Sequence, residues 1–143
     1  KSKYVFERYG QNCFADDSGL EVEALNNEPG IYSARYSGIR DDQQNLHLVL
    51  EKLSNSMNRK ARFITVIALI INKEEHFFEG IIEGNIAHRP SGKKGFGYDP
   101  IFIPKGYSVT FADLDIVEKN KISHRAMATQ KLITFLNQYP TVL

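Results

Sequence analysis

The sequence predicts an α/β fold in which a mixed, twisted central sheet has helices at its sides. Two apolar segments with strand character, residues 61–71 and 76–88, follow each other in the chain. Helical patterns precede and follow them, in residues 42–53 and 124–137. This order favours a layered α/β domain over a sandwich or a bundle. We expect residues 1–143 to form one domain, because a chain of this length can bury about two-thirds of its unfolded surface in one core.

The first elements are short. Tyr4, Val5 and Arg8 are spaced along one helical face, so residues 1–9 are expected to be helical. Because the chain starts at Lys1 inside this helix and without Met, we expect further sequence upstream. Residues 13–15 predict a short buried strand that ends at a turn containing Ser18.

The second helix follows a loop around residues 29–30 and is expected to begin at Asp41 or Asp42, which are good N-cap residues. Its apolar residues recur at i, i+3, i+4 and i+7, and this stripe should face the core. The stripe consists of Leu46, Val49, Leu50 and Leu53.

The strand pair forms the centre of the predicted sheet. Residues 61–71 are apolar almost throughout, which is typical of a strand covered on both faces. Residues 72–75 should form a hairpin turn. In the next strand, period-two alternation puts one set of residues on one face, and its two glycines suggest a close backbone contact. That set is Phe78, Gly80, Ile82, Gly84 and Ile86.

Composition excludes several classes of protein. The chain has 18 Lys and Arg against 17 Asp and Glu, and a net charge of +1 provides no overall attraction to nucleic acid or to a membrane surface. Its longest apolar run, residues 63–71, is far shorter than the ~20 residues that cross a bilayer. A single cysteine, Cys13, cannot form an internal disulfide. We therefore expect a cytoplasmic protein without nucleic-acid or membrane partners.

Asp16 and Asp17 form an acidic pair at the end of the first predicted strand, where α/β folds often bind ligands. Neighbouring side chains in an extended segment point to opposite faces, so only one of the two carboxylates should serve a given metal ion. The Asp-Ser-Gly sequence is also ordinary turn chemistry, which leaves a purely structural interpretation open.

A basic cluster surrounds the predicted start of the last helix, where Ser123 is the expected N-cap. A helix N-terminus prefers negative charge, so cations there need compensation, and a bound anion would supply it. A solvated basic patch is the alternative. The cluster consists of Lys119, Lys121, His124 and Arg125.

The segment GFGYDP, residues 95–100, is a third candidate. Pro100 biases Asp99 toward an extended conformation. Phe96 and Tyr98 offer flat faces on which a base could stack, a contact that contributes ~1–3 kcal/mol. Taken alone, this segment could equally be a plain aromatic loop. The chain has no zinc-type spacing of His and Cys and no Walker-type phosphate loop.

Four segments, taken together and in this order, resemble the inosine/xanthosine triphosphate pyrophosphatase family. They are ADDSGL at 15–20, PGIYSARYSG at 29–38, GFGYDP at 95–100 and EKNKISHR at 118–125. The resemblance extends over essentially the whole chain. It implies a nucleotide cleft between two lobes and a Mg²⁺-dependent homodimer. It also implies hydrolysis of noncanonical purine nucleoside triphosphates (ITP, dITP, XTP) to the monophosphate and pyrophosphate.

The resemblance also implies roles for individual residues. Asp17 corresponds to the catalytic base or metal-side carboxylate, whereas the role of Asp16 stays undecided. The residues that correspond to substrate contacts are Ser18, Phe96, Gly97, Tyr98, Asp99, Lys119, His124, Arg125 and Lys1. The N-terminal strand and phosphate loop of the family, with its metal-binding glutamate, are missing from this sequence.

Selectivity would depend on the six-position of the purine, where hypoxanthine and xanthine carry an oxygen. Side-chain donors at His124 and Arg125 suit that oxygen. Two alternatives remain from the sequence. One is a related pyrophosphatase that acts on modified pyrimidine triphosphates. The other is a nucleotide-binding module without catalysis, because the phosphate loop is missing.

Overall fold

A five-stranded sheet forms the centre of the molecule in the computed structural model, which describes residues 7 and 10–139. Its strand order is β2-β1-β3-β4-β5. The strands are β1 (Cys13–Val22), β2 (Glu28–Pro29), β3 (Lys60–Ile71), β4 (Glu74–Ile86) and β5 (Phe102–Pro104). The helices are α2 (Asp42–Leu53), α3 (Ile116–Ile122) and α4 (His124–Gln138), with short 3-10 turns between the elements.

The predicted α/β class, with a long sheet and flanking helices, is confirmed. Within the described residues every strand pairing is antiparallel. No helix in this part of the chain is long and apolar enough to cross a membrane. The helix expected over residues 1–9 lies outside the described residues apart from Glu7.

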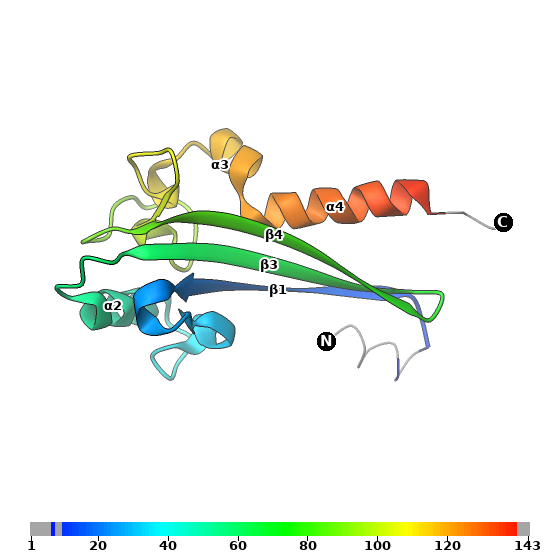
Figure 1. Ribbon diagram of the computed structural model, residues 1–143, viewed down its shortest axis with the longest axis horizontal. Coiled ribbons are helices and arrows are strands. Elements are labelled where there is room, and N and C mark those ends of the chain that lie inside the picture. Colours follow the sequence, from blue (N-terminus) through cyan, green and yellow to red (C-terminus); the bar gives the residue numbers. More distant parts are fainter. Residues whose placement is uncertain (1–6, 8–9, 140–143) are drawn as a thin grey trace.

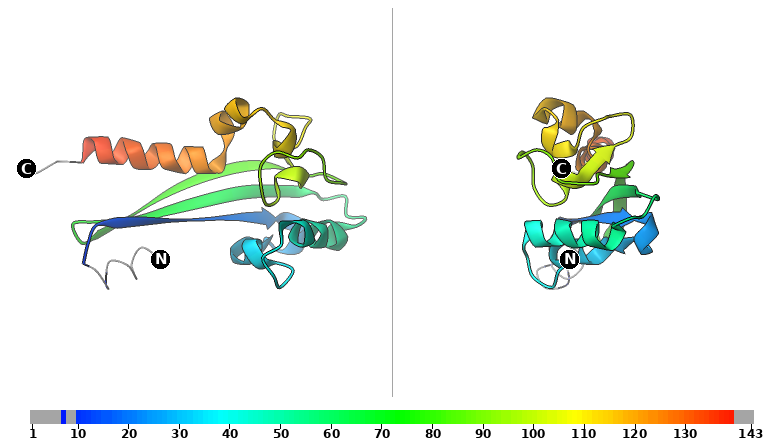
Figure 2. Two further views of the ribbon diagram at one scale, coloured as in Figure 1. Left: turned by 180° about the vertical axis from the view of Figure 1, so that it is seen from behind. Right: turned by 90° about the vertical axis from the view of Figure 1, so that its left-hand side faces the viewer.

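The three long strands run along the length of the molecule, which is narrow at one end and broad at the other (Figure 1). Figure 1 shows β1, β3 and β4 side by side, with α4 running along β4 toward the narrow end. At the broad end, α2 lies on one side of the strands, and the segment that contains β5 and α3 lies on the other. The end-on view in Figure 2 shows the same two lobes.

One face of the sheet carries two hydrophobic clusters with a polar row between them. The register places three rows side by side on this face: Leu20, Phe63 and Ile82; Ser18, Thr65 and Gly80; Asp16, Ile67 and Phe78. The first row belongs to the cluster at the broad end, which α2 completes with Leu46, Val49 and Leu53. Beyond the polar row, Ile67 packs with Ala128 and Leu132 of α4 in the second cluster. The middle row is therefore the only break between the two clusters on this face of the described residues.

Both helix caps expected from the sequence are confirmed. The Asp41 side chain accepts a hydrogen bond from the Gln44 amide at 3.1 Å, and α2 begins at the next residue, Asp42. The Ser123 hydroxyl accepts one from the Ala126 amide at 3.1 Å and caps α4. Each cap satisfies a backbone N–H that has no partner within its helix.

Two predictions for the strands are wrong. The turn expected at Ser18 is absent, because β1 continues to Val22 and the Ser18 hydroxyl pairs with Thr65 Oγ1 at 2.7 Å across the strands. Residues of β3 alternate between buried and half-buried, so within the described residues only one face of this strand is fully covered. The predicted hairpin turn and the shared face of β4 are confirmed.

Gly80 of β4 allows the first turn of α4 to rest directly on the strand. A Cβ atom at this position would overlap the carbonyl oxygen of His124 and would lie 2.7 Å from the Ala128 amide nitrogen. Both atoms belong to the helix backbone, which cannot move aside as a flexible side chain could. The glycine therefore sets the distance between α4 and the sheet.

We predict that Gly80→Ala lowers the free energy of unfolding by about 1–3 kcal/mol, the usual cost of forcing extra volume into a packed interface. Urea denaturation measures the change. Glu79→Ala, the neighbouring exposed residue on β4, is the control and should change stability by less than about 0.5 kcal/mol. Equal losses in the two variants would contradict a steric role for Gly80.

Candidate functional site

A cleft of about 460 Å³ opens over the polar row, between the two lobes. This volume lies within the range of small-molecule sites. Its lining comes from β1, the turn before α2, α2 itself, β3, the loop before β5, α3 and α4. The polar and aromatic residues that line it are Asp16, Asp17, Ser18, Ser33, Asp42, Asn45, Phe63, Phe96, Tyr98, Asp99, Lys119, Asn120, Ser123, His124 and Arg125.

The three candidate segments from the sequence meet in this cleft. Asp17 and Ser18 of β1, residues 96–99 of the loop, and Lys119, His124 and Arg125 all line it. Of the predicted substrate contacts, only Lys1 lies outside the described residues. The sites therefore share one space, although Ser18 and Arg125, which are in contact, are 107 residues apart along the chain.

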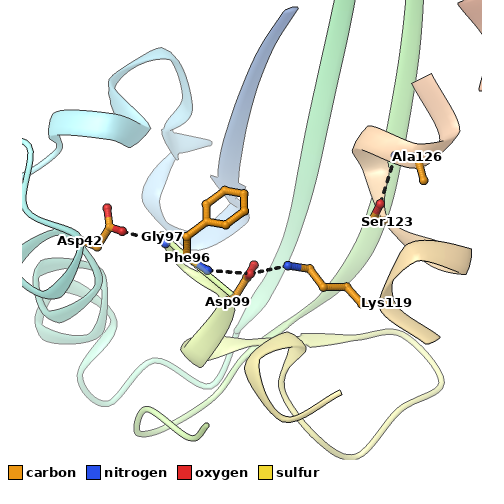
Figure 3. A network of polar contacts seen from close by, with 7 residues as sticks. All are labelled: Asp42, Phe96, Gly97, Asp99, Lys119, Ser123 and Ala126. Atoms are coloured by element: carbon orange, nitrogen blue, oxygen red, sulfur yellow. Dashed lines mark hydrogen bonds and ion pairs between the residues drawn. The ribbon is translucent and has the colours of Figure 1, made fainter. Parts of the chain in front are cut away.

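The loop at residues 95–99 is held by the carboxylate of Asp99. This carboxylate accepts a hydrogen bond from the Phe96 amide at 3.1 Å and forms an ion pair with Lys119 Nζ at 2.6 Å (Figure 3). The Gly97 amide donates to Asp42 Oδ2 of α2 at 3.0 Å, so the loop spans the two lobes. Asp99 begins a 3-10 turn, and the extended conformation predicted for it is wrong because these contacts outweigh the bias from Pro100.

The two aromatic residues of the loop have different environments. Tyr98 is 5% exposed, belongs to the hydrophobic core, and donates a hydrogen bond to the Ser33 carbonyl at 2.6 Å. Burial raises the pKa of its hydroxyl well above the usual value. Phe96 is 69% exposed and borders the cleft. Lys119 Nζ lies over the Phe96 ring, 5.2 Å from its centroid, so of the two aromatic residues Phe96 is the one whose exposed ring can contact a ligand.

The basic cluster is divided between two helices, which the sequence did not reveal. Lys119 and Lys121 lie in the last turn of α3, where cations interact favourably with the helix dipole. Only His124 and Arg125 begin α4. The sequence predicted an unfavourable interaction between four basic residues and the positive end of one helix dipole. In the structure, Arg125 is the charged residue for which this interaction remains.

His124 is packed under the cleft as a neutral imidazole. Its ring stacks on Phe63 with centroids 4.8 Å apart and planes at 13°. Burial first, and then the charges of Arg125 and Lys119, lower its pKa to about 4. Its Nδ1 atom is buried and has no hydrogen-bond partner among the described residues. Such an atom is the kind of group that a bound ligand satisfies.

Arg125 reaches from α4 to two residues of β1. Its Nη1 atom pairs with Asp16 Oδ2, and its Nη2 atom donates to the Ser18 hydroxyl at 3.0 Å. Lys119 pairs with Asp99 in the same cleft. Both cations that line the cleft in the described residues are therefore paired with carboxylates.

Asp17 lies on the opposite face of β1 from Asp16 and Ser18, as strand alternation predicts. Its register partner is Val66, whereas that of Asp16 is Ile67. Asp17 borders the cleft and also a neighbouring hollow of about 330 Å³ beside Ile64 and Val66. No group of three or more His, Cys, Asp or Glu side chains among residues 7 and 10–139 could hold a metal ion.

Sequence reasoning missed several residues that shape the cleft. Thr65 is fully buried and supports Ser18, and Phe63 supports His124. Both looked like ordinary members of an apolar strand. The position of Asp42 indicated only the start of a helix, although its carboxylate also accepts a hydrogen bond from Gly97 in the loop of the other lobe. These roles depend on pairings between segments that no local pattern reveals.

Comparison with known proteins gives a consistent result. The model of the Ham1 family matches residues 1–135. A dITP/XTP pyrophosphatase of Flavobacterium psychrophilum is 53% identical over 136 residues, which are 94% of this chain and 72% of that protein. One from Porphyromonas gingivalis is 53% identical over 138 residues, 95% of this chain and 71% of that protein. The solved Ham1 protein of Staphylococcus aureus superposes with a TM-score of 0.92 at 43% identity, over 95% of this chain and 72% of that one.

The fold and the site define an α/β protein with a ligand-sized cleft between two lobes. Within that class the family follows from matches over nearly the whole chain. The chain belongs to the Ham1 family.

We predict that His124 makes stability depend on pH. The folded state holds the pKa near 4, below the usual 6.5, so the unfolded chain takes up the proton first as the pH falls. The free energy of unfolding is therefore not reduced by this residue above pH 6.5. It falls by up to about 3 kcal/mol as the pH falls from 6.5 toward 4. Urea denaturation at pH 7, 5.5 and 4 measures it. His124→Gln should show a flatter pH dependence, and equal slopes for both proteins would exclude this residue as the cause.

Proposed function

We propose that the protein hydrolyses noncanonical purine nucleoside triphosphates, such as dITP, ITP and XTP, to the monophosphate and pyrophosphate. The observation that carries this proposal is the meeting of Phe96, His124, Arg125 and Asp17 around one cleft of nucleotide size. The substrates in the names of the similar pyrophosphatases agree with it.

The charge pairs suggest how the nucleotide lies in the cleft. Lys119 and Arg125 form one wall of the cleft, and each is neutralised by a carboxylate. This wall therefore suits an uncharged base better than a triphosphate. Phe96 is exposed beside it for stacking on the base. We place the base between Phe96 and His124, with the phosphates running toward Asp17.

The same wall can select the base. Arg125 has donors beyond the two contacts it makes with β1, and His124 is neutral, so both can serve an oxygen at the six-position. Adenine presents an amino group there and would leave these donors unpaired. A buried unpaired donor costs ~1–3 kcal/mol, enough for a preference of up to about a hundredfold. We assign direct contacts with the nucleotide to Ser18, Gly97 and Asp99 as well, because they line the same space.

We propose Mg²⁺ as the metal, held by Asp17. Mg²⁺ usually binds through one or two carboxylates and the substrate phosphates, so the chain does not need a closed cage of ligands. When bound, the ion supplies charge that offsets the triphosphate. Asp17 would orient the attacking water and accept its proton as pyrophosphate leaves the α-phosphorus.

We further propose that the enzyme works as a cytoplasmic homodimer and that residues 1–143 belong to one domain. Exposed apolar side chains on the turn before α2, Ile31 at 86% and Tyr32 at 60%, support an interface with a second copy. A single cysteine in the sequence, Cys13, is compatible with a reducing compartment.

We predict that Asp17→Asn lowers kcat for ITP by about 10²–10⁴-fold if this carboxylate accepts the proton. The assay is release of pyrophosphate by the intact protein. Glu79→Gln is the matched control, because it neutralises an exposed carboxylate on the same face of the sheet two strands away. Near-normal turnover of Asp17→Asn would contradict the assignment. Binding of ITP by the wild type without any hydrolysis would instead favour a non-catalytic nucleotide-binding module.

We predict that Arg125→Ala raises KM for ITP more than KM for ATP, because only the six-position oxygen loses a donor. The preference for ITP in kcat/KM should fall by about 5- to 100-fold. Lys121→Ala removes a neighbouring cation that does not line the cleft, and its preference should stay that of the wild type. An unchanged preference in Arg125→Ala would count against base recognition by this residue.

A further inference from the structure

Asp16 contacts the substrate-facing arginine of the cleft, and the function proposed above uses it only to neutralise that arginine. Its carboxylate pairs with Arg125 Nη1, while Arg125 Nη2 donates to the Ser18 hydroxyl at 3.0 Å. Asp16 and Ser18 are two residues apart on one strand and therefore share a face. One guanidinium thus spans two neighbouring acceptors on a rigid element.

The acceptors are themselves fixed. Ser18 Oγ lies 2.7 Å from Thr65 Oγ1, and Thr65 is fully buried in the middle of β3. The arginine Cα is fixed from the other side, because Gly80 lets the first turn of α4 rest on β4. Both ends of the bridge are therefore set by the sheet.

We infer that Asp16 is a positioning residue that aims the free donors of Arg125 at the base and so sets the preference for six-oxo purines. This inference rests on the proposed function and deepens it. The side chains of Asp16 and Arg125 are 39% and 50% exposed, so the ion pair adds little to folding stability. Its effect is on orientation, because the planar guanidinium binds in a fixed direction when two of its nitrogens are occupied.

Removal of the carboxylate has two consequences for binding. The guanidinium loses its fixed direction and must be ordered again when the nucleotide binds, which raises KM. It also becomes an unpaired cation that attracts the phosphates of any nucleoside triphosphate. Both changes reduce discrimination between bases, and neither acts on the step in which water attacks phosphorus.

A role as a second metal ligand is the main competing role for Asp16. Asp16 and Asp17 point to opposite faces of β1, so they cannot bind one ion without distortion of the strand. The pairing with Arg125 also occupies the Asp16 carboxylate. A metal role predicts that the Mg²⁺ concentration for half-maximal rate rises in Asp16→Asn, whereas a positioning role leaves it unchanged.

The test compares Asp16→Asn, Asp16→Glu, Arg125→Ala and the double variant Asp16→Asn/Arg125→Ala in the intact protein. We expect Asp16→Asn to raise KM for ITP about tenfold, to leave kcat within about twofold, and to reduce the preference over ATP. Asp16→Glu keeps the charge and should recover most of the preference. The double variant should behave as Arg125→Ala alone, because the carboxylate acts only through the arginine.

Glu28→Gln is the matched control. Glu28 pairs with Lys52 and accepts a hydrogen bond from the Tyr36 hydroxyl, a similar bridge that lies outside the cleft lining. It should leave KM, kcat and the preference unchanged.

Three results would overturn the inference: a loss confined to kcat, a shifted Mg²⁺ requirement, or losses in the double variant that multiply those of the single variants. If the wild type does not hydrolyse ITP, the proposed function fails, and calorimetric titration with inosine monophosphate still tests the inference. Equal affinity of Asp16→Asn and wild type for that nucleotide would then overturn it, and an affinity about tenfold weaker in the variant would support it.

Discussion

The contact between the first turn of α4 and the bare backbone of β4 at Gly80 controls the geometry of the cleft. A side chain at this position would push the helix away, because the atoms it would meet belong to the helix backbone. With the helix seated there, His124 stacks on Phe63 and Arg125 reaches Ser18 on β1. The small residues of the middle row thus leave room for a cleft between two hydrophobic clusters, and they determine which side chains border it.

The charges in this cleft are arranged in pairs, which has a consequence for substrate binding. A triphosphate carries several negative charges, yet Lys119 and Arg125 already pair with Asp99 and Asp16. For phosphates to bind these cations, the ion pairs with Asp99 and Asp16 would have to break, which costs free energy. An uncharged base can bind beside the cations without breaking these pairs. This pairing supports our proposal that Lys119 and Arg125 face the neutral part of the nucleotide and that a bound cation offsets the phosphate charge elsewhere.

Much of the fold could be predicted from the sequence because its signals are local. The caps at Asp41 and Ser123, the apolar stripe of α2 and the alternation of β4 depend on residues within a few positions of each other. The errors concern contacts between distant segments. The turn expected at Ser18 is absent because Thr65 supplies a hydrogen bond from β3, and Asp99 leaves its preferred extended state because Lys119 holds it. For the site, the motifs predicted segments that the structure brings together in one cleft, whereas the division of the basic residues between α3 and α4 required the structure.

The alternation of side chains along β1 is sufficient to give Asp16 and Asp17 different environments. A strand that continues past Asp17 must point Asp16 to one face and Asp17 to the other. On one face the carboxylate meets Arg125 and is neutralised. On the other face, Asp17 has Val66 as its register partner and also borders a second hollow whose lining does not include Arg125. Extension of β1 to Val22 therefore puts the proposed positioning role of Asp16 and the proposed role of Asp17 at the phosphates on opposite faces of one strand.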